Sequence, residues 1–118
     1  MKIIIAGSRN ISDGFALSSV MREAGYILKE NIDEIVSGGA RGVDRLGEVY
    51  AKEQGITIKR FPADWEQYGK AAGYIRNAEM AEYADALVVL WDGQSKGTLH
   101  MINTAAKKGM PVFIKVLT

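Results

Sequence analysis

Three glycines, Gly38, Gly39 and Gly42, follow a short apolar run near the middle of the chain, and Arg41 stands among them. Glycine allows positive φ angles and lets a ligand approach the backbone closely. If a helix begins after this turn, its first N–H groups lack partners inside the helix and can bind an anion. The guanidinium of Arg41 could add a two-pronged contact. The pattern predicts a phosphate or nucleotide site, while a plain strand-to-helix turn would need only two of these glycines.

A second glycine-bearing turn, DGQSKGT, runs from Asp92 to Thr98. Hydroxyl and amide groups ahead of a helix suit an oxyanion, and they equally suit ordinary capping by Ser95 or Thr98. Asp44 would lie in the first turn of the helix after Gly42, where a carboxylate complements the helix dipole. Because a bound phosphate would repel it, we expect Asp44 to reach a ribose hydroxyl or to contact Arg41.

Four basic residues accompany these turns. Arg9 follows the first apolar run, Arg41 stands in the glycine turn, and Lys70 and Arg76 belong on or near a later helix. Any one of these residues, taken alone, could be an ordinary solvated cation at the surface. Together they could neutralise one or two phosphates. Asn77 could hydrogen-bond a ribose or a base, or cap local backbone.

Several catalytic classes fit the sequence poorly. It contains neither a GxSxG nor a GxxxxGK[ST] pattern, which argues against a serine hydrolase and a P-loop NTPase. There is no cysteine, and His100 is the only histidine, so we expect no disulfide, no metal site and no cofactor. The carboxylates near the predicted site are those of Asp44, Glu48, Asp64 and Asp92, and the sequence does not rank them as acids or bases.

Composition sets further bounds on the partners. The 118 residues carry a net charge of +1 without a basic run, so strong non-specific binding of nucleic acid is not expected. No apolar run reaches membrane-spanning length, and the chain opens on an apolar strand pattern rather than on a signal peptide. We therefore expect a cytoplasmic protein with no membrane partner.

Short apolar runs alternate with helical patterns along the chain, which predicts a parallel sheet with helices on both faces. The expected strands are 2–6, 34–37, 56–61, 86–91 and 112–117, and the expected helices are 15–30, 43–54, 70–83 and 99–108. Residues 1–118 would form one α/β domain with a doubly wound, five-stranded sheet. The turns after the strands would then share one edge, where the turns 38–42 and 92–98 face each other across the switch point.

Four segments resemble the SLOG superfamily of Rossmann-like domains, which includes DNA-processing protein A and the LOG phosphoribohydrolases. They are GSR at 7–9, SGGARGVD at 37–44, KAAGYIRN at 70–77 and WDGQSKGT at 91–98. The resemblance spans nearly the whole chain and is strongest to the small stand-alone YspA/YpsA-like branch. It implies a nucleotide-derived small molecule held by the two glycine turns. Together with the residues argued above, the predicted ligand contacts are Gly7, Ser8, Arg9, Gly38, Gly39, Arg41, Gly42, Asp44, Lys70, Arg76, Asn77, Asp92, Gly93, Ser95, Gly97 and Thr98.

The departures from the family patterns bear on activity. LOG enzymes carry a PGGxGTxxE signature with a catalytic Glu, and here Met101 takes that place. DNA-processing protein A carries SGxARGIDxxAH, and here Gly47 and Glu48 replace the final Ala and His. A module that binds or senses a nucleotide is therefore favoured over an N-glycosidase, with DNA binding a distant third. Family members commonly oligomerise, and the apolar last helix and strand favour a homodimer.

Overall fold

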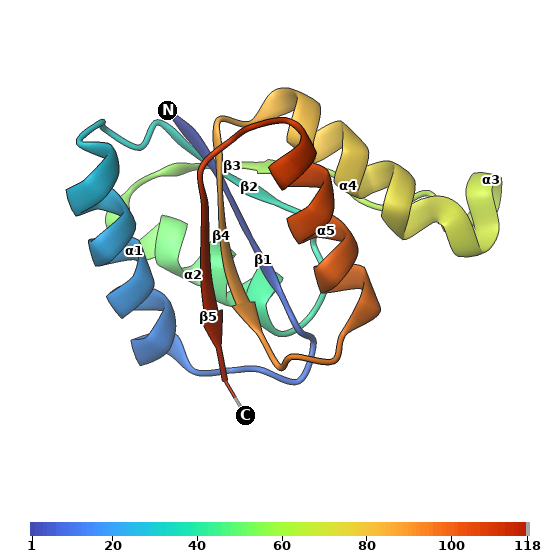
Figure 1. The fold of residues 1–118 in the computed structure, drawn as a ribbon, viewed down its shortest axis with the longest axis horizontal. Helices are drawn as coiled ribbons and strands as arrows, with labels where there is room; N and C mark the ends of the chain where they lie inside the picture. Colours follow the sequence, from blue (N-terminus) through green and yellow to red (C-terminus); the bar gives the residue numbers. More distant parts are fainter. Residues whose placement is uncertain (118) are drawn as a thin grey trace.

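The computed structural model describes residues 1–117 and shows a five-stranded parallel sheet between two layers of helices (Figure 1). The strands are β1 (Lys2–Gly7), β2 (Glu34–Ser37), β3 (Thr57–Arg60), β4 (Ala86–Trp91) and β5 (Val112–Val116). The helices are α1 (Gly14–Leu28), α2 (Val43–Gln54), the single turn α3 (Trp65–Tyr68), the 3-10 turn η1 (Gly69–Ala71), α4 (Ala72–Tyr83) and α5 (Lys96–Lys107).

The strand order β3-β2-β1-β4-β5 confirms the doubly wound α/β fold. From β1 the chain continues to β2 and β3 on one side and then crosses to β4 on the other side of β1. Strand β4 pairs with β1 from Ile3 opposite Ala86 to Gly7 opposite Leu90. All neighbouring pairs are parallel, so the carboxyl ends of the strands share one edge. The switch point of such a sheet, here between β1 and β4, is where ligands bind in open α/β folds.

The central strand β1 supplies side chains to two separate cores. Ile3 and Ile5 pack with α1 and α2 on one face, while Ile4 and Ala6 pack with α4 and α5 on the other. Successive side chains of a strand point to opposite faces, so a continuous apolar run such as this one is buried on both sides. Figure 1 shows the two helix pairs on opposite sides of the sheet, with α3 projecting beyond the end of α4.

Local hydrogen bonds set the helix boundaries. The Asp13 carboxylate accepts the Ala16 amide at 3.0 Å and starts α1, and Gly55, at φ 70°, ends α2 as predicted. The last helix was predicted from Leu99, but α5 begins at Lys96 because the Ser95 hydroxyl accepts the Thr98 amide at 3.3 Å. Ser95 is therefore the cap, and the end of the predicted turn is already helical.

The segment after β3 also differs from the prediction. The Asp64 carboxylate accepts the Gln67 amide at 3.1 Å and caps α3, a turn of helix that the sequence did not reveal. Residues 69–71 then form η1, so the helix predicted from Lys70 begins as α4 at Ala72. Within residues 1–117, no helix combines the length and the apolar character needed to cross a membrane.

Candidate functional site

A cleft of about 770 Å³ lies at the carboxyl edge of the sheet, where the chain leaves β1 and β4. We call it the switch-point cleft. Its walls come from the turn after β1, the turn before α2, the η1–α4 segment and the turn into α5. Twelve of the predicted contacts line it together: Gly7, Ser8, Arg9, Arg41, Asp44, Lys70, Arg76, Asn77, Asp92, Ser95, Gly97 and Thr98.

Four predicted contacts lie outside this lining. Gly38 and Gly39 line a neighbouring cleft, and neither Gly42 nor Gly93 lines either of the two. A Cβ on Gly42 would lie 2.5 Å from the Ser8 carbonyl oxygen, and the residue has φ 77°. The glycine turn therefore packs directly on the turn after β1, and this contact between backbones explains why position 42 requires glycine.

The amide groups of the glycine turn are partly used by the protein itself. The Gly39 amide donates to the Ser37 hydroxyl at 3.1 Å, and the Ala40 amide donates to Asp44 Oδ2 at 3.1 Å. Among residues 1–117, the amides of Arg41 and Gly42 have no acceptor. Of these two residues only Arg41 lines the switch-point cleft, so its N–H group is the one of the pair that an anion in the cleft can reach.

The side chains of Asp44 and Arg76 both lie against Gly38. Arg76 Nη1 donates to the Gly38 carbonyl at 2.8 Å, and a Cβ on Gly38 would lie 2.4 Å from that nitrogen and 2.8 Å from Asp44 Oδ2. Arg76 Nε also donates to Asn77 Oδ1 at 3.2 Å. Within the described chain, Asp44 forms no hydrogen bond or ion pair with Arg41, so the expected contact between them is replaced by the one with Ala40.

Asp44 is a buried carboxyl in the wall of the cleft, with 6% of its surface exposed. Burial raises the pKa of Asp44 from 3.8 to about 6, against the lowering effects of the Ala40 amide and of the positive charges of Arg76 and Arg9. Burial likewise lowers the pKa of Arg76. The cleft therefore holds a carboxyl that changes its charge near pH 6, within reach of physiological conditions.

The turn into α5 is tied to the turn after β1. Asp92 donates its amide to the Ser8 hydroxyl at 3.0 Å, and its Oδ1 accepts the amides of Gln94 and Ser95 at 2.9 and 2.8 Å. The amides of Ser95 and Gln94 hold the pKa of Asp92 below its usual value. The Thr98 hydroxyl donates to Ser95 Oγ at 3.0 Å. These side chains have structural roles besides any contact with a ligand.

One face of α4 forms another wall of the switch-point cleft. Gly73, Tyr74, Asn77 and Met80 all line the cleft, and the spacing of three and four residues between them is helical. The Asn77 amide donates to the Gly97 carbonyl at 3.3 Å, which ties α4 to α5. Sequence reasoning missed Tyr74, although its spacing from Asn77 within KAAGYIRN would have placed it here.

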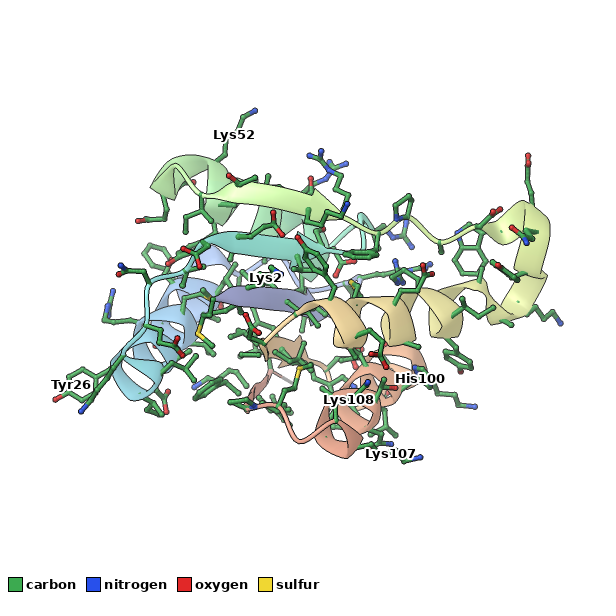
Figure 2. The ribbon with its side chains drawn as sticks, turned by 90° about the horizontal axis from the view of Figure 1, so that it is seen from above. Lys2, Tyr26, Lys52, His100, Lys107 and Lys108 are labelled. Atoms are coloured by element: carbon green, nitrogen blue, oxygen red, sulfur yellow. The ribbon has the colours of Figure 1, made fainter. Side chains whose placement is uncertain are left out.

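His100 belongs to α5, and its side chain contacts α4 (Figure 2). The Tyr74 ring stacks on the His100 ring with 4.2 Å between centroids, and Asn77 Nδ2 lies 3.1 Å from His100 Nδ1. His100 therefore packs against α4. Met101, which the resemblance aligns with the catalytic Glu of LOG enzymes, lies in the lining with 1% of its surface exposed.

Comparisons with known proteins agree with the fold and the motifs. The sequence model of the YAcAr group, described as the YspA, cpYpsA-related SLOG family, matches residues 1–68. The chain is 36% identical over 121 aligned residues to the Gene 61 protein of Mycobacterium phage D29, covering 94% of this chain and 93% of the phage protein.

Among solved structures, DNA processing protein A (DprA) from Streptococcus pneumoniae is similar, with a TM-score of 0.72 over 96% of this chain. The identity is 22%, so this likeness concerns the fold, and the chain spans about half of that protein, 49%. The match to the family model, by contrast, extends over more than half of the present chain. The protein therefore belongs to the YspA, cpYpsA-related SLOG family.

Proposed function

We propose that the switch-point cleft binds a nucleotide or a nucleotide-derived small molecule, and that the protein serves as a binding or sensing module. The observation that carries this proposal is the convergence of two helix-opening turns, 40–44 and 92–98, on one cleft beside Arg9 and Arg76. Each turn presents the positive end of a helix dipole, so a phosphate between them is stabilised from two sides.

The remaining lining suits the other parts of a nucleotide. Asp44 and Asn77 are buried hydrogen-bonding groups at the wall, in position for ribose hydroxyls or a base edge. Trp65, which is half-exposed at the rim, offers a ring on which a base can stack. Ala6, Met80 and Met101 add an apolar part to the lining, against which the less polar atoms of a nucleotide can pack.

The proposal is tested by titration calorimetry with nucleoside monophosphates, NAD and ADP-ribose. Arg41→Ala removes a charged hydrogen bond and should weaken binding roughly ten- to a hundredfold. Arg22→Ala, which removes an exposed cation on α1 away from the cleft, should bind like the parent. If Arg41→Ala and Arg9→Ala both keep the parent affinity, the ligand binds elsewhere.

A second candidate is an enzyme that cleaves an N-glycosidic bond. It is favoured by Asp44, whose pKa of about 6 lies where a general acid is effective. Met101 argues against a LOG-type reaction, so we expect binding without turnover in the same titrations. Release of free base on the order of 1 per second would identify an enzyme instead.

The homodimer and the cytoplasmic location remain predictions. Leu99 and Ile114, from the apolar set that suggested a dimer, are exposed on α5 and the edge strand β5. Met101, from the same set, is buried and contributes nothing to such a surface. Sedimentation velocity would test the dimer, which the proposed ligand site does not require.

A further inference from the structure

A second cleft, of about 730 Å³, adjoins the first at the ends of β2 and β3. We call it the arginine cleft, because five arginines line it: Arg9, Arg41, Arg45, Arg60 and Arg76. Glu48 is the one carboxylate in this lining, so the lining carries a net charge of +4 in a chain whose net charge is +1. They come from four parts of the chain, with Arg41 and Arg45 four residues apart, which is why the sequence shows no basic run.

Much of this positive charge is not neutralised by the protein. Arg60 Nε and Nη2 donate to Glu48 Oε1 at 3.0 and 2.7 Å, and Glu48 Oε2 accepts the Ser37 hydroxyl at 2.8 Å. By contrast, no hydrogen bond or ion pair within residues 1–117 engages the guanidinium groups of Arg9, Arg41 and Arg45. Three unpaired guanidinium groups around one cavity favour an anion, because like charges repel each other until an opposite charge binds between them.

The two clefts adjoin and share part of their lining. Arg9, Ala40, Arg41, Trp65 and Arg76 line both of them. A ligand seated at the switch point can therefore extend past these shared residues into the arginine cleft. Arg45 and Arg60 line the arginine cleft alone, so they would contact only the extended part of such a ligand.

We propose that the arginine cleft holds a second phosphate group of the nucleotide bound in the switch-point cleft. The ligand class is then a nucleoside diphosphate derivative, such as one esterified to a second sugar, rather than a nucleoside monophosphate. Arg45 contacts the second phosphate and so distinguishes a diphosphate from a monophosphate. Arg60, held in place by Glu48, lies beside the same phosphate. The inference rests on the proposed function, since it assigns a further part of the same ligand.

The arrangement favours a compact ligand over a nucleic acid. Single strands bind along grooves in which cations follow the backbone and several aromatic rings stack on successive bases. Here the arginines converge on one cavity, and Trp65 is the one aromatic residue in its lining. A small anion with two phosphates can contact most of these arginines at once, whereas a long nucleic-acid strand would contact few of them.

The test compares AMP with ADP-ribose by titration calorimetry on the parent and three variants of α2. Arg45→Gln should lower the affinity for ADP-ribose roughly tenfold and leave that for AMP within about twofold. Glu48→Gln keeps the size of the side chain and an acceptor for Arg60, and it should raise the affinity for ADP-ribose several-fold. Lys52→Gln, whose parent side chain extends into solvent at the far end of α2 (Figure 2), should change neither affinity.

Three results would overturn the inference. If the parent binds AMP as tightly as ADP-ribose and Arg45→Gln affects both alike, the second phosphate site is wrong while the proposed function stands. If the parent binds neither compound nor any other nucleotide of the panel, the proposed function fails as well. If oligothymidylate binds more tightly than ADP-ribose and its affinity increases with length, the arginine cleft is a nucleic-acid site.

Discussion

Asp44→Asn should stabilise the protein relative to the parent by an amount that increases from acid to neutral pH. The folded-state pKa of about 6 lies above the ordinary value of 3.8, because burial disfavours the charged form. The stability contributed by the neutral carboxyl is therefore fully present below about pH 4 and is lost as the pH rises through about 6. A shift of this size corresponds to about 3 kcal/mol.

An asparagine at position 44 stays neutral and can still accept the Ala40 amide, so it avoids this loss. Urea unfolding at about pH 4.5 and about pH 7.5 measures the change, and the difference between variant and parent should increase by about 2 kcal/mol, because part of the loss has already occurred at about pH 4.5. Asp92→Asn should instead destabilise the protein to a similar extent at both pH values, because backbone amides lower the pKa of Asp92 and its stabilising charge is lost only below about pH 4. A difference between Asp44→Asn and parent that does not change with pH would contradict the account of a buried, destabilising carboxylate.

Keeping a costly buried charge is typical of a functional site. If Asp44 contacts a ribose hydroxyl, the more stable Asp44→Asn variant should also bind nucleotide more weakly. A variant that gains stability and keeps full affinity would show that Asp44 does not contact the ligand.

Gly42→Ala should destabilise the protein by roughly 3 kcal/mol or more, because two costs add. The added Cβ would lie 2.5 to 2.6 Å from backbone atoms of Ser8 and Arg9, which cannot move aside as a flexible side chain could. The φ of 77° and ψ of −128° also belong to a conformation that residues other than glycine rarely adopt.

Two other glycines provide matched controls for thermal and urea unfolding. Gly39 also has a positive φ, of 75°, but a Cβ there meets nothing within 4 Å, so Gly39→Ala carries only the conformational cost of roughly 1 kcal/mol. Gly97 lies in α5 with open space around it, so Gly97→Ala should be neutral or slightly stabilising. If Gly42→Ala is as stable as Gly39→Ala, the two turns do not pack as closely as described.

The sheet was predictable because its signals are local. The run KIIIA is buried on both faces, and each of its apolar side chains belongs to one of the two cores, as a central parallel strand requires. Gly55 ended α2 where predicted because few other residues adopt its left-handed conformation. The predicted start of α5, at Leu99, was wrong. Ser95 and Thr98 are both good caps, and only the three-dimensional structure shows that Ser95 accepts the Thr98 amide.

The site was predictable only where its residues follow strand ends. Arg9 and Arg41 were identified because the carboxyl ends of parallel strands share an edge. Arg45 and Arg60 were missed because each stands alone in an ordinary sequence context and only the fold brings them together. The burial of Asp44, which raises its pKa, likewise depends on contacts between segments far apart in the chain.

The central claim, that one nucleotide phosphate binds between two helix-opening turns, is tested most directly by amide chemical shifts in ¹⁵N-labelled protein titrated with ADP-ribose. Within residues 1–117, the amides of Arg41 and Gly97 have no acceptor, and both residues line the switch-point cleft beside the openings of α2 and α5. We predict that these two amides shift most, and together, as the cleft fills. Shifts confined to one of the two turns, or no shift with any nucleotide of the panel, would contradict the claim.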